Sequence, residues 1–249
     1  MFYNRKKIIK RYISIFAVLM ILIYSIIEVV KYNVEGEKNM PFNLSKITIV
    51  STAEGKTKEN GLNEKEKQWC VDVIQNNDIY FSIQKNDRYK KEEKIQSISI
   101  ENIVVEEEPK KGEIKKYMPN SIEGNLFNYD EAFLVGYGLT YKGAEKSDYK
   151  LLQIGNQGGT ALIRISNTEL GEYVLDKESE LVHDGNLLAN INLKNEEVKF
   201  KVKFDLIIDV KNKAFKTTIE LELPYGDITK EGTETQELIN DGKFIFKRV

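Results

Sequence analysis

The sequence predicts an all-β fold: an antiparallel, sandwich-like exterior domain of about ten strands, preceded by one N-terminal transmembrane helix. Two observations lead to this prediction. Residues 12–27 contain no charged side chain and follow a basic segment. From residue 44 onward, apolar residues recur at every second position in short runs separated by turn residues, which is the pattern of half-buried strands.

The basic start and the apolar run indicate a signal-anchor helix over residues 12–30. Residues 1–11 carry five basic side chains and no acidic one. At about 1.5 Å per residue the helix is about 28 Å long, close to the bilayer core of about 30 Å. No small-x-small cleavage site follows it, which argues against a cleaved signal peptide. The run is apolar on all sides, which argues against a buried soluble helix.

The positive-inside rule gives the orientation. Residues 1–11 are then cytoplasmic, 31–43 form a polar stalk, and 44–249 form an extracytoplasmic β domain. We expect a single-pass protein of the cell membrane with its C-terminal domain outside the cell. The chain contains 32 Lys and only 5 Arg, a bias that is typical of AT-rich genomes, as in many Gram-positive bacteria.

The exterior residues 31–249 carry 32 basic and 38 acidic side chains, a net charge of −6. This charge argues against nucleic acid or anionic lipid headgroups as the main ligand of the domain.

The clearest strand signal is a long hairpin over residues 198–223. Apolar residues alternate with charged or polar ones in both halves of this segment. A two-residue loop at 212–213 places Asp205 opposite Glu220, an unfavourable pair of like charges.

Further alternating runs complete the predicted sheets. They lie at 47–49, 79–83, 98–105, 133–141, 161–165, 187–193 and 244–246. The run 98–105 changes face near Glu101 and Asn102, which predicts a β-bulge. Residues 56–68 are expected as a loop or a surface helix, and 229–242 as a connection. One sandwich is the main expectation, and a division into two small sandwiches near 110–130 stays open.

The residues that could carry catalysis form no motif. His183 precedes Asp184, but neighbours on a strand point to opposite faces, so we expect a surface histidine beside a turn. Cys70 could act as a nucleophile with His183 as its base, yet no third residue supports the pair. Cys70 is therefore expected to be a small buried hydrophobe.

Metal and phosphate sites have little support. One His and one Cys are too few for a zinc site. No EF-hand loop occurs, although the many carboxylates leave calcium open. The segments 76–78 and 184–186 are expected as turns, and so is 155–159, which lacks the Lys-Ser/Thr of a phosphate loop. We assign no catalytic, cofactor-binding or metal-binding residues.

A set of aromatic residues lies in the middle of the chain. They are Phe127, Tyr129, Tyr137, Tyr141, Tyr149 and Tyr173. Aromatic faces beside polar groups are typical of sugar-binding sites, and two facing carboxylates would add glycoside hydrolysis. The competing interpretation is that Tyr137 and Tyr141 share a core-facing side of one strand with Phe133 and Val135.

These observations favour a non-enzymatic binding or assembly role at the cell envelope, carried by edge strands and exposed loop aromatics. The expected partner is another envelope protein, a second copy of the chain or cell-wall glycan, and not nucleic acid. No cofactor is expected. The alternative is an extracytoplasmic glycan-binding or glycan-hydrolysing protein, with Asp130 and Glu131 as its first candidate carboxylates.

Overall fold

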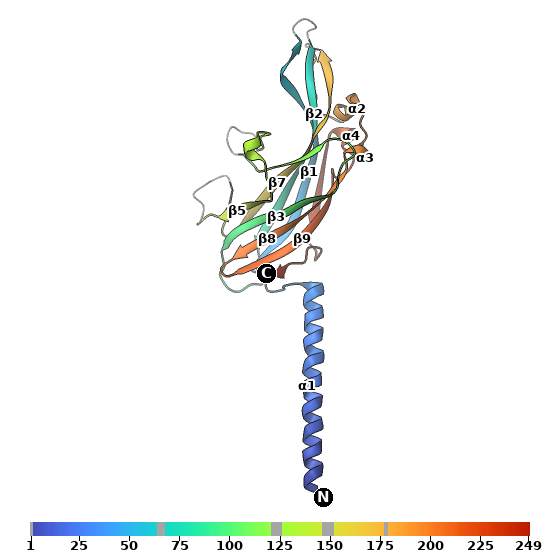
Figure 1. Cartoon of the computed structure of the whole chain (residues 1–249). Coiled ribbons are helices and arrows are strands. Elements are labelled where there is room, and N and C mark those ends of the chain that lie inside the picture. The colour runs from blue at the N-terminus through green and yellow to red at the C-terminus, as the bar shows by residue number, and fades with distance from the viewer. Residues whose placement is uncertain (1, 64–67, 121–125, 146–151, 177–178) are drawn as a thin grey trace.

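The structure is a computed structural model that describes residues 2–63, 68–120, 126–145, 152–176 and 179–249. Helix α1 (Phe2–Glu35) stands apart from the β-rich remainder of the chain (Figure 1). Its segment Ile9–Glu35 is long and apolar enough to span a membrane, and its apolar window is not buried by the rest of the protein. The predicted N-terminal apolar helix is therefore present.

Two sheets form the β domain, with strand orders β10-β1-β2-β7-β4 and β11-β9-β8-β3-β5-β6. The first contains β1 (Phe42–Asn63), β2 (Gln68–Lys85), β4 (Glu113–Tyr117), β7 (Gly158–Asp176) and β10 (Thr233–Ile239); the second contains β3 (Ile95–Glu107), β5 (Gly138–Gly143), β6 (Gln153–Ile154), β8 (Phe200–Val210), β9 (Lys213–Leu223) and β11 (Lys247–Arg248). All neighbours pair antiparallel except β5 and β6. The predicted sandwich-like, all-β fold is confirmed.

Both sheets combine strands from the two halves of the chain. Strand β2 pairs with β7, and β3 pairs with β8. Each sheet is thus completed by long-range pairing, which a division into two consecutive sandwiches near 110–130 would not allow.

The main core lies between the two sheets and follows the period-two pattern. Inward positions such as Ile79, Phe81 and Ile83 are buried, and so are Phe204 and Phe215 from the other sheet. The rings of Phe81 and Phe204 meet edge to face with 5.6 Å between their centres. Burial of alternate side chains is what gives each strand one apolar and one polar face.

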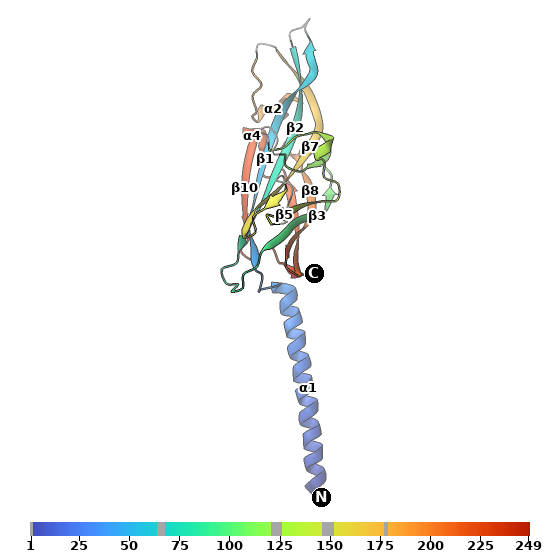
Figure 2. The same cartoon turned by 90° about the vertical axis from the view of Figure 1, so that its left-hand side faces the viewer.

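A second, smaller core lies further from α1, where β1, β2 and β7 extend beyond the opposite sheet (Figures 1 and 2). Three short helices cover this extension: α2 (Asn186–Asn190), α3 (Asn195–Val198) and α4 (Ile228–Glu231). Val73 and Leu170 from the strands pack here with Leu187 and Leu188 from α2.

Several local predictions are wrong. The run 133–141 is a strand only from Gly138, because Glu131–Phe133 forms a 3-10 helix, and 244–246 precedes the strand β11 instead of forming one. Residues 187–193 do not form a strand, because Leu187 and Leu188 are both buried on the helix α2, which strand alternation does not allow. Segment 76–78 is not a turn but the buried middle of β2. Residues 56–68 contain the ends of β1 and β2, and 64–67 lie outside the described residues.

The β8–β9 hairpin has a different register from the predicted one. Val210 pairs with Lys213, so the loop is 211–212 and Asp205 faces Thr218 instead of a glutamate. A shift of two residues keeps every side chain on its predicted face and removes the repulsive pair. The predicted bulge in β3 is confirmed by a register shift between Glu101 and Val104.

Candidate functional site

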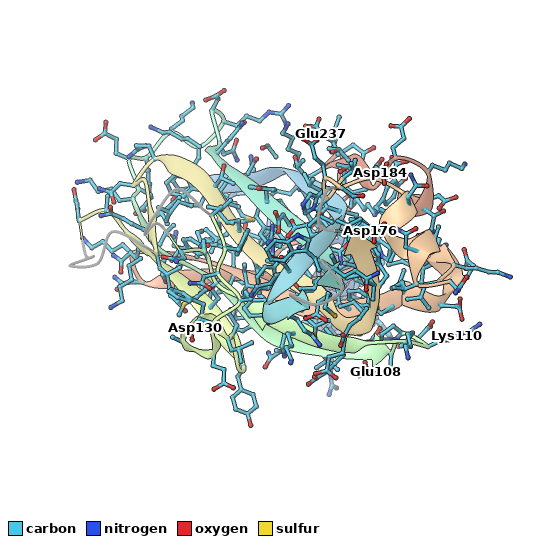
Figure 3. All side chains as sticks on the ribbon, turned by 90° about the horizontal axis from the view of Figure 1, so that it is seen from above. Glu108, Lys110, Asp130, Asp176, Asp184 and Glu237 are labelled. Atoms are coloured by element: carbon cyan, nitrogen blue, oxygen red, sulfur yellow. The ribbon has the colours of Figure 1, made fainter. Side chains whose placement is uncertain are left out.

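Asp130 and Glu131 are adjacent, exposed residues at the start of a short 3-10 helix, and Asp184, the neighbour of His183, lies far from them. In the view from above, Asp130 and Asp184 are on opposite sides of the molecule (Figure 3). The Asp130 carboxylate accepts a hydrogen bond from the Ala132 backbone N–H at 3.1 Å and caps the short 3-10 helix η1 (Glu131–Phe133). Asp184 accepts from the backbone N–H of Asn186 at 2.9 Å. Each carboxylate thus stabilises its own turn.

His183 and Cys70 form hydrogen bonds with different partners. His183 is exposed, and its Nδ1 accepts from the Gly55 backbone N–H at 3.3 Å. The Cys70 thiol is half-buried and donates to Glu172 Oε2 at 2.9 Å. This hydrogen bond and, secondly, burial raise the pKa of the Cys70 thiol. A raised pKa is the reverse of what an activated nucleophile needs.

The six aromatic residues of the middle region lie in different environments. Phe127 and Tyr141 are buried, Tyr173 packs against the second core, and Tyr149 lies outside the described residues. Tyr137 is 96% exposed. The expectation that Tyr137 and Tyr141 share a core-facing side is therefore met only for Tyr141.

Sequence reasoning missed a polar cluster around Arg164, on the outer side of β7. The guanidinium donates to both carboxylate oxygens of Asp78, at 2.6 and 2.8 Å, and to the Tyr129 hydroxyl at 3.0 Å. It lies 4.4 Å from the centre of the Phe127 ring. Tyr129 in turn donates to Glu54 Oε2 at 2.7 Å. The cluster joins three strands to the loop that carries Phe127 and Tyr129.

The Arg164 cluster is internally satisfied. Burial, followed by the charge of Glu54 and the hydrogen bond to it, raises the pKa of Tyr129, so this phenol stays protonated and keeps donating. Arg164 and Asp78 side chains are only 11% and 13% exposed. Their charges neutralise each other, which is the usual condition for burying an ion pair. We assign this cluster to folding of the loop rather than to ligand binding.

A groove of about 1070 Å³ is lined by residues of β9, β10 and the segments next to them. Apolar residues form part of its lining: Ile49, Leu193, Leu221, Pro224, Tyr225 and Leu238. Charged residues are also present: Lys194, Lys199, Lys243, Glu196, Glu220, Glu222 and Asp227. The groove therefore combines an apolar lining with charges of both signs.

Both sheets end at this groove. Strand β10 is the edge of the first sheet, and no described strand pairs with its outer side. At the edge of the second sheet, β11 pairs only with Phe215 and Lys216 of β9. No described strand covers the outer edge of β9 from 217 to 223. Both strands contribute groove-lining residues.

Two charged groups at the groove have defined partners. Lys199 lies 2.9 Å from a Glu196 oxygen and 3.8 Å from a Glu222 oxygen. Asp227 accepts from the Thr229 backbone N–H at 3.1 Å and also from the Thr229 hydroxyl. Hydrogen bonding with Thr229 lowers the pKa of Asp227. The groove therefore stays charged at neutral pH.

The groove could have been anticipated only in part. The segment 233–239 was expected within a connection, but it forms β10. Its composition, Thr-Glu-Thr-Gln-Glu-Leu-Ile, is polar on both faces, as edge strands often are. That signal identifies an edge but not what lies opposite it.

In the described part of the chain, no three His, Cys, Asp or Glu side chains form a group that could hold a metal ion. No protein-family model, curated protein or solved structure matches this chain.

Proposed function

We propose that the protein is a single-pass, membrane-anchored extracytoplasmic protein with a non-enzymatic binding or assembly role at the cell envelope. Its binding site is the groove between β9 and β10, and its ligand is an extended segment of another envelope protein that pairs with the free edge of β9. The observation that carries this proposal is the meeting of two unpaired sheet edges at one groove.

An unpaired strand edge presents a row of backbone N–H and C=O groups that an extended peptide can satisfy. Residues 217–223 of β9 offer about 24 Å of such edge, at about 3.4 Å per residue. The backbone hydrogen bonds would supply affinity, and the side chains lining the groove would supply specificity.

The chain already places a segment of its own on this edge. Strand β11 pairs with β9 at Phe215 and Lys216, and the preceding Phe244 and Phe246 are buried in the main core. A partner segment would continue the same arrangement along β9. Alternate apolar side chains would face Leu221 and Leu238, as Phe244 and Phe246 face the core.

Photocrosslinking in cells tests this proposal, because the groove carries a partly exposed aromatic residue. Tyr225, 39% exposed, is replaced by a photoreactive phenylalanine analogue in the full-length protein. Tyr137, which directly precedes β5, is replaced in the same way as a control, since β5 and β9 are separated by two strands in the sheet. We expect one crosslinked protein partner from position 225 and none from position 137.

Two other outcomes would overturn the proposal. Crosslinks of equal yield from both positions would mean that the groove is not selective. Recovery of cell-wall glycan from position 137, without a protein from position 225, would support the glycan-binding alternative. A crosslink to a second copy of the chain would identify self-association as the assembly.

A further inference from the structure

Basic side chains gather at the end of the β domain that adjoins α1. Four segments form this end, which we call the basal face: 36–41, 85–95, 210–214 and 240–249. They carry eleven basic side chains against five acidic ones. The remaining residues of 31–249 carry 21 basic and 33 acidic side chains. A domain that is acidic as a whole therefore has one cationic end.

Hydrogen bonds place these four segments together. The Asn86 backbone N–H donates to Pro41 O at 2.9 Å, which ties the 85–95 segment to the connection after α1. The Val249 N–H donates to Ala214 O at 3.0 Å, which ties the β8–β9 turn to the C-terminal segment. Segments distant in the sequence thus form one surface.

The basal face is held at the end of α1. The Glu37 backbone N–H donates to Phe246 O at 2.8 Å, and the Arg248 N–H donates to the Tyr32 hydroxyl at 2.8 Å. A side chain at Gly36 would clash, because an added Cβ would lie 2.4 Å from Phe246 O. The domain therefore meets the helix at a packed junction with the basal face toward the helix (Figure 1).

Several of the basal cations are free to meet an external anion. Lys85, Arg88, Lys90, Lys91 and Lys211 are exposed. Within the described part of the chain, none of the five forms an ion pair, whereas Lys94 is paired with Glu145 and Lys38 with Glu35.

We infer that the basal face docks on anionic lipid headgroups of the same membrane that α1 enters. The inference rests on insertion of α1. The segment Ile9–Glu35 has 27 residues, about 40 Å of helix, which exceeds a bilayer core of about 30 Å and ends in the headgroup layer. Cations attached at that end lie within a Debye length, about 8–10 Å, of the lipid phosphates.

The charge distribution also sets the orientation of the domain. An anionic surface attracts the basal face and repels the acidic remainder. Tilting of the domain toward the bilayer would bring acidic surface to the phosphates. Docking therefore holds the domain upright on the membrane.

Fluorescence quenching in vesicles tests the inference with the full-length protein. In a Cys70→Ser background, a dye is attached at Glu92→Cys on the basal face, or at Asp176→Cys at the far end of β7 as the matched control. The protein is inserted into vesicles of phosphatidylcholine alone or with phosphatidylglycerol, each with a headgroup-attached quencher. We expect phosphatidylglycerol to increase quenching at position 92 and not at position 176.

Charge reversal separates electrostatic docking from simple proximity. Lys90→Glu/Lys91→Glu should remove most of the phosphatidylglycerol-dependent quenching, whereas the matched pair Lys110→Glu/Lys111→Glu should leave it unchanged. Salt at about 1 M, where the Debye length is about 3 Å, should also remove it. Equal quenching in both lipids, or insensitivity to salt, would overturn the inference. Neither outcome bears on crosslinking in the groove, so the two proposals fail separately.

Discussion

At the scale of single residues, Arg164 shows how the outer face of a sheet can bury a charge. Its guanidinium holds the Asp78 carboxylate through two hydrogen bonds and lies against the Phe127 ring. Removing one member of such a pair leaves its partner uncompensated, which costs far more than the pair contributes.

We predict that Arg164→Leu lowers the free energy of unfolding by about 3–5 kcal/mol, since Asp78 would stay buried without a partner. Lys201→Met is the control, because the Lys201–Glu107 pair is exposed and its loss should cost less than about 1 kcal/mol. Urea unfolding of the detergent-solubilised chain measures both. Similar losses for the two variants would contradict the prediction.

Asp205 links stability to pH. Burial alone would raise the pKa of Asp205, but hydrogen bonds from Thr218, Asn102 and Lys216 outweigh it, and the pKa is lowered. The unfolded chain therefore binds a proton at Asp205 more readily than the folded protein does. The stabilisation that the Asp205 carboxylate gives the folded protein is complete above the unfolded pKa of 3.8. It is lost as pH falls through the folded value.

We therefore predict that Asp205→Asn destabilises the protein by about 2 kcal/mol at pH 7, since it removes hydrogen bonds to a charged group. The difference from the natural protein should begin to shrink as pH falls below the unfolded value of 3.8, and it should disappear once pH has passed the lower folded value, where Asp205 itself becomes protonated. Urea unfolding at several pH values measures this convergence. Parallel stability curves down to about pH 2 would argue against the lowered pKa.

At the scale of elements, the β8–β9 hairpin shows which properties a strand pattern determines. The alternation of apolar and polar residues assigns each side chain to one face of the sheet. The predicted register, with a loop at 212–213, and the observed register, with a loop at 211–212, both satisfy this alternation. Only the loop distinguishes them, and Asn212 at its second position has φ 60°, a left-handed conformation that asparagine tolerates.

We predict that Lys203→Cys/Glu220→Cys forms a disulfide readily in a Cys70→Ser background, because these two residues are directly opposite. Their Cβ atoms should lie about 4.5–5.5 Å apart, whereas a diagonal pair lies at about 7–8 Å. Lys203→Cys/Glu222→Cys is therefore the control. Faster oxidation of the control, followed by gel mobility, would support the register with a loop at 212–213.

Helices, strands and turns could be predicted where a local sequence pattern determines them. The prediction failed where contacts with distant residues determine the conformation. Asn76, Asn77 and Asp78 have turn-forming side chains, yet they lie within β2. Asn77 Oδ1 accepts from the Ser51 hydroxyl at 2.8 Å, and Asn76 Oδ1 accepts from the Ser166 hydroxyl at 2.6 Å. Neighbouring strands satisfy these amides, so the turn preference has no advantage.

At the scale of the whole molecule, the single cysteine reports on membrane topology. Cys70 lies on β2, beyond the main core, and its thiol is half-buried. An impermeant thiol reagent can reach it only from the compartment that holds the β domain.

We predict that a membrane-impermeant maleimide labels Cys70 on intact cells. Labelling should be slow at neutral pH, because the hydrogen bond to Glu172 raises the thiol pKa, and faster in Glu172→Gln. Mass-tagged gels measure both effects, with Cys70→Ser as the background. Labelling only after permeabilisation would place the β domain in the cytoplasm.

The sequence by itself determined the apolar helix and most strands, because both depend on periodic patterns within a few neighbouring residues. Tertiary structure alone decided the strand order, the α2 helix, the Arg164 cluster and the groove between β9 and β10. The basal face belongs to the second group: its cations come from segments as distant as Lys38 and Arg248. Long-range pairing brings these segments together. The net charge of the whole domain is negative, so it does not show that one end has an excess of positive charge.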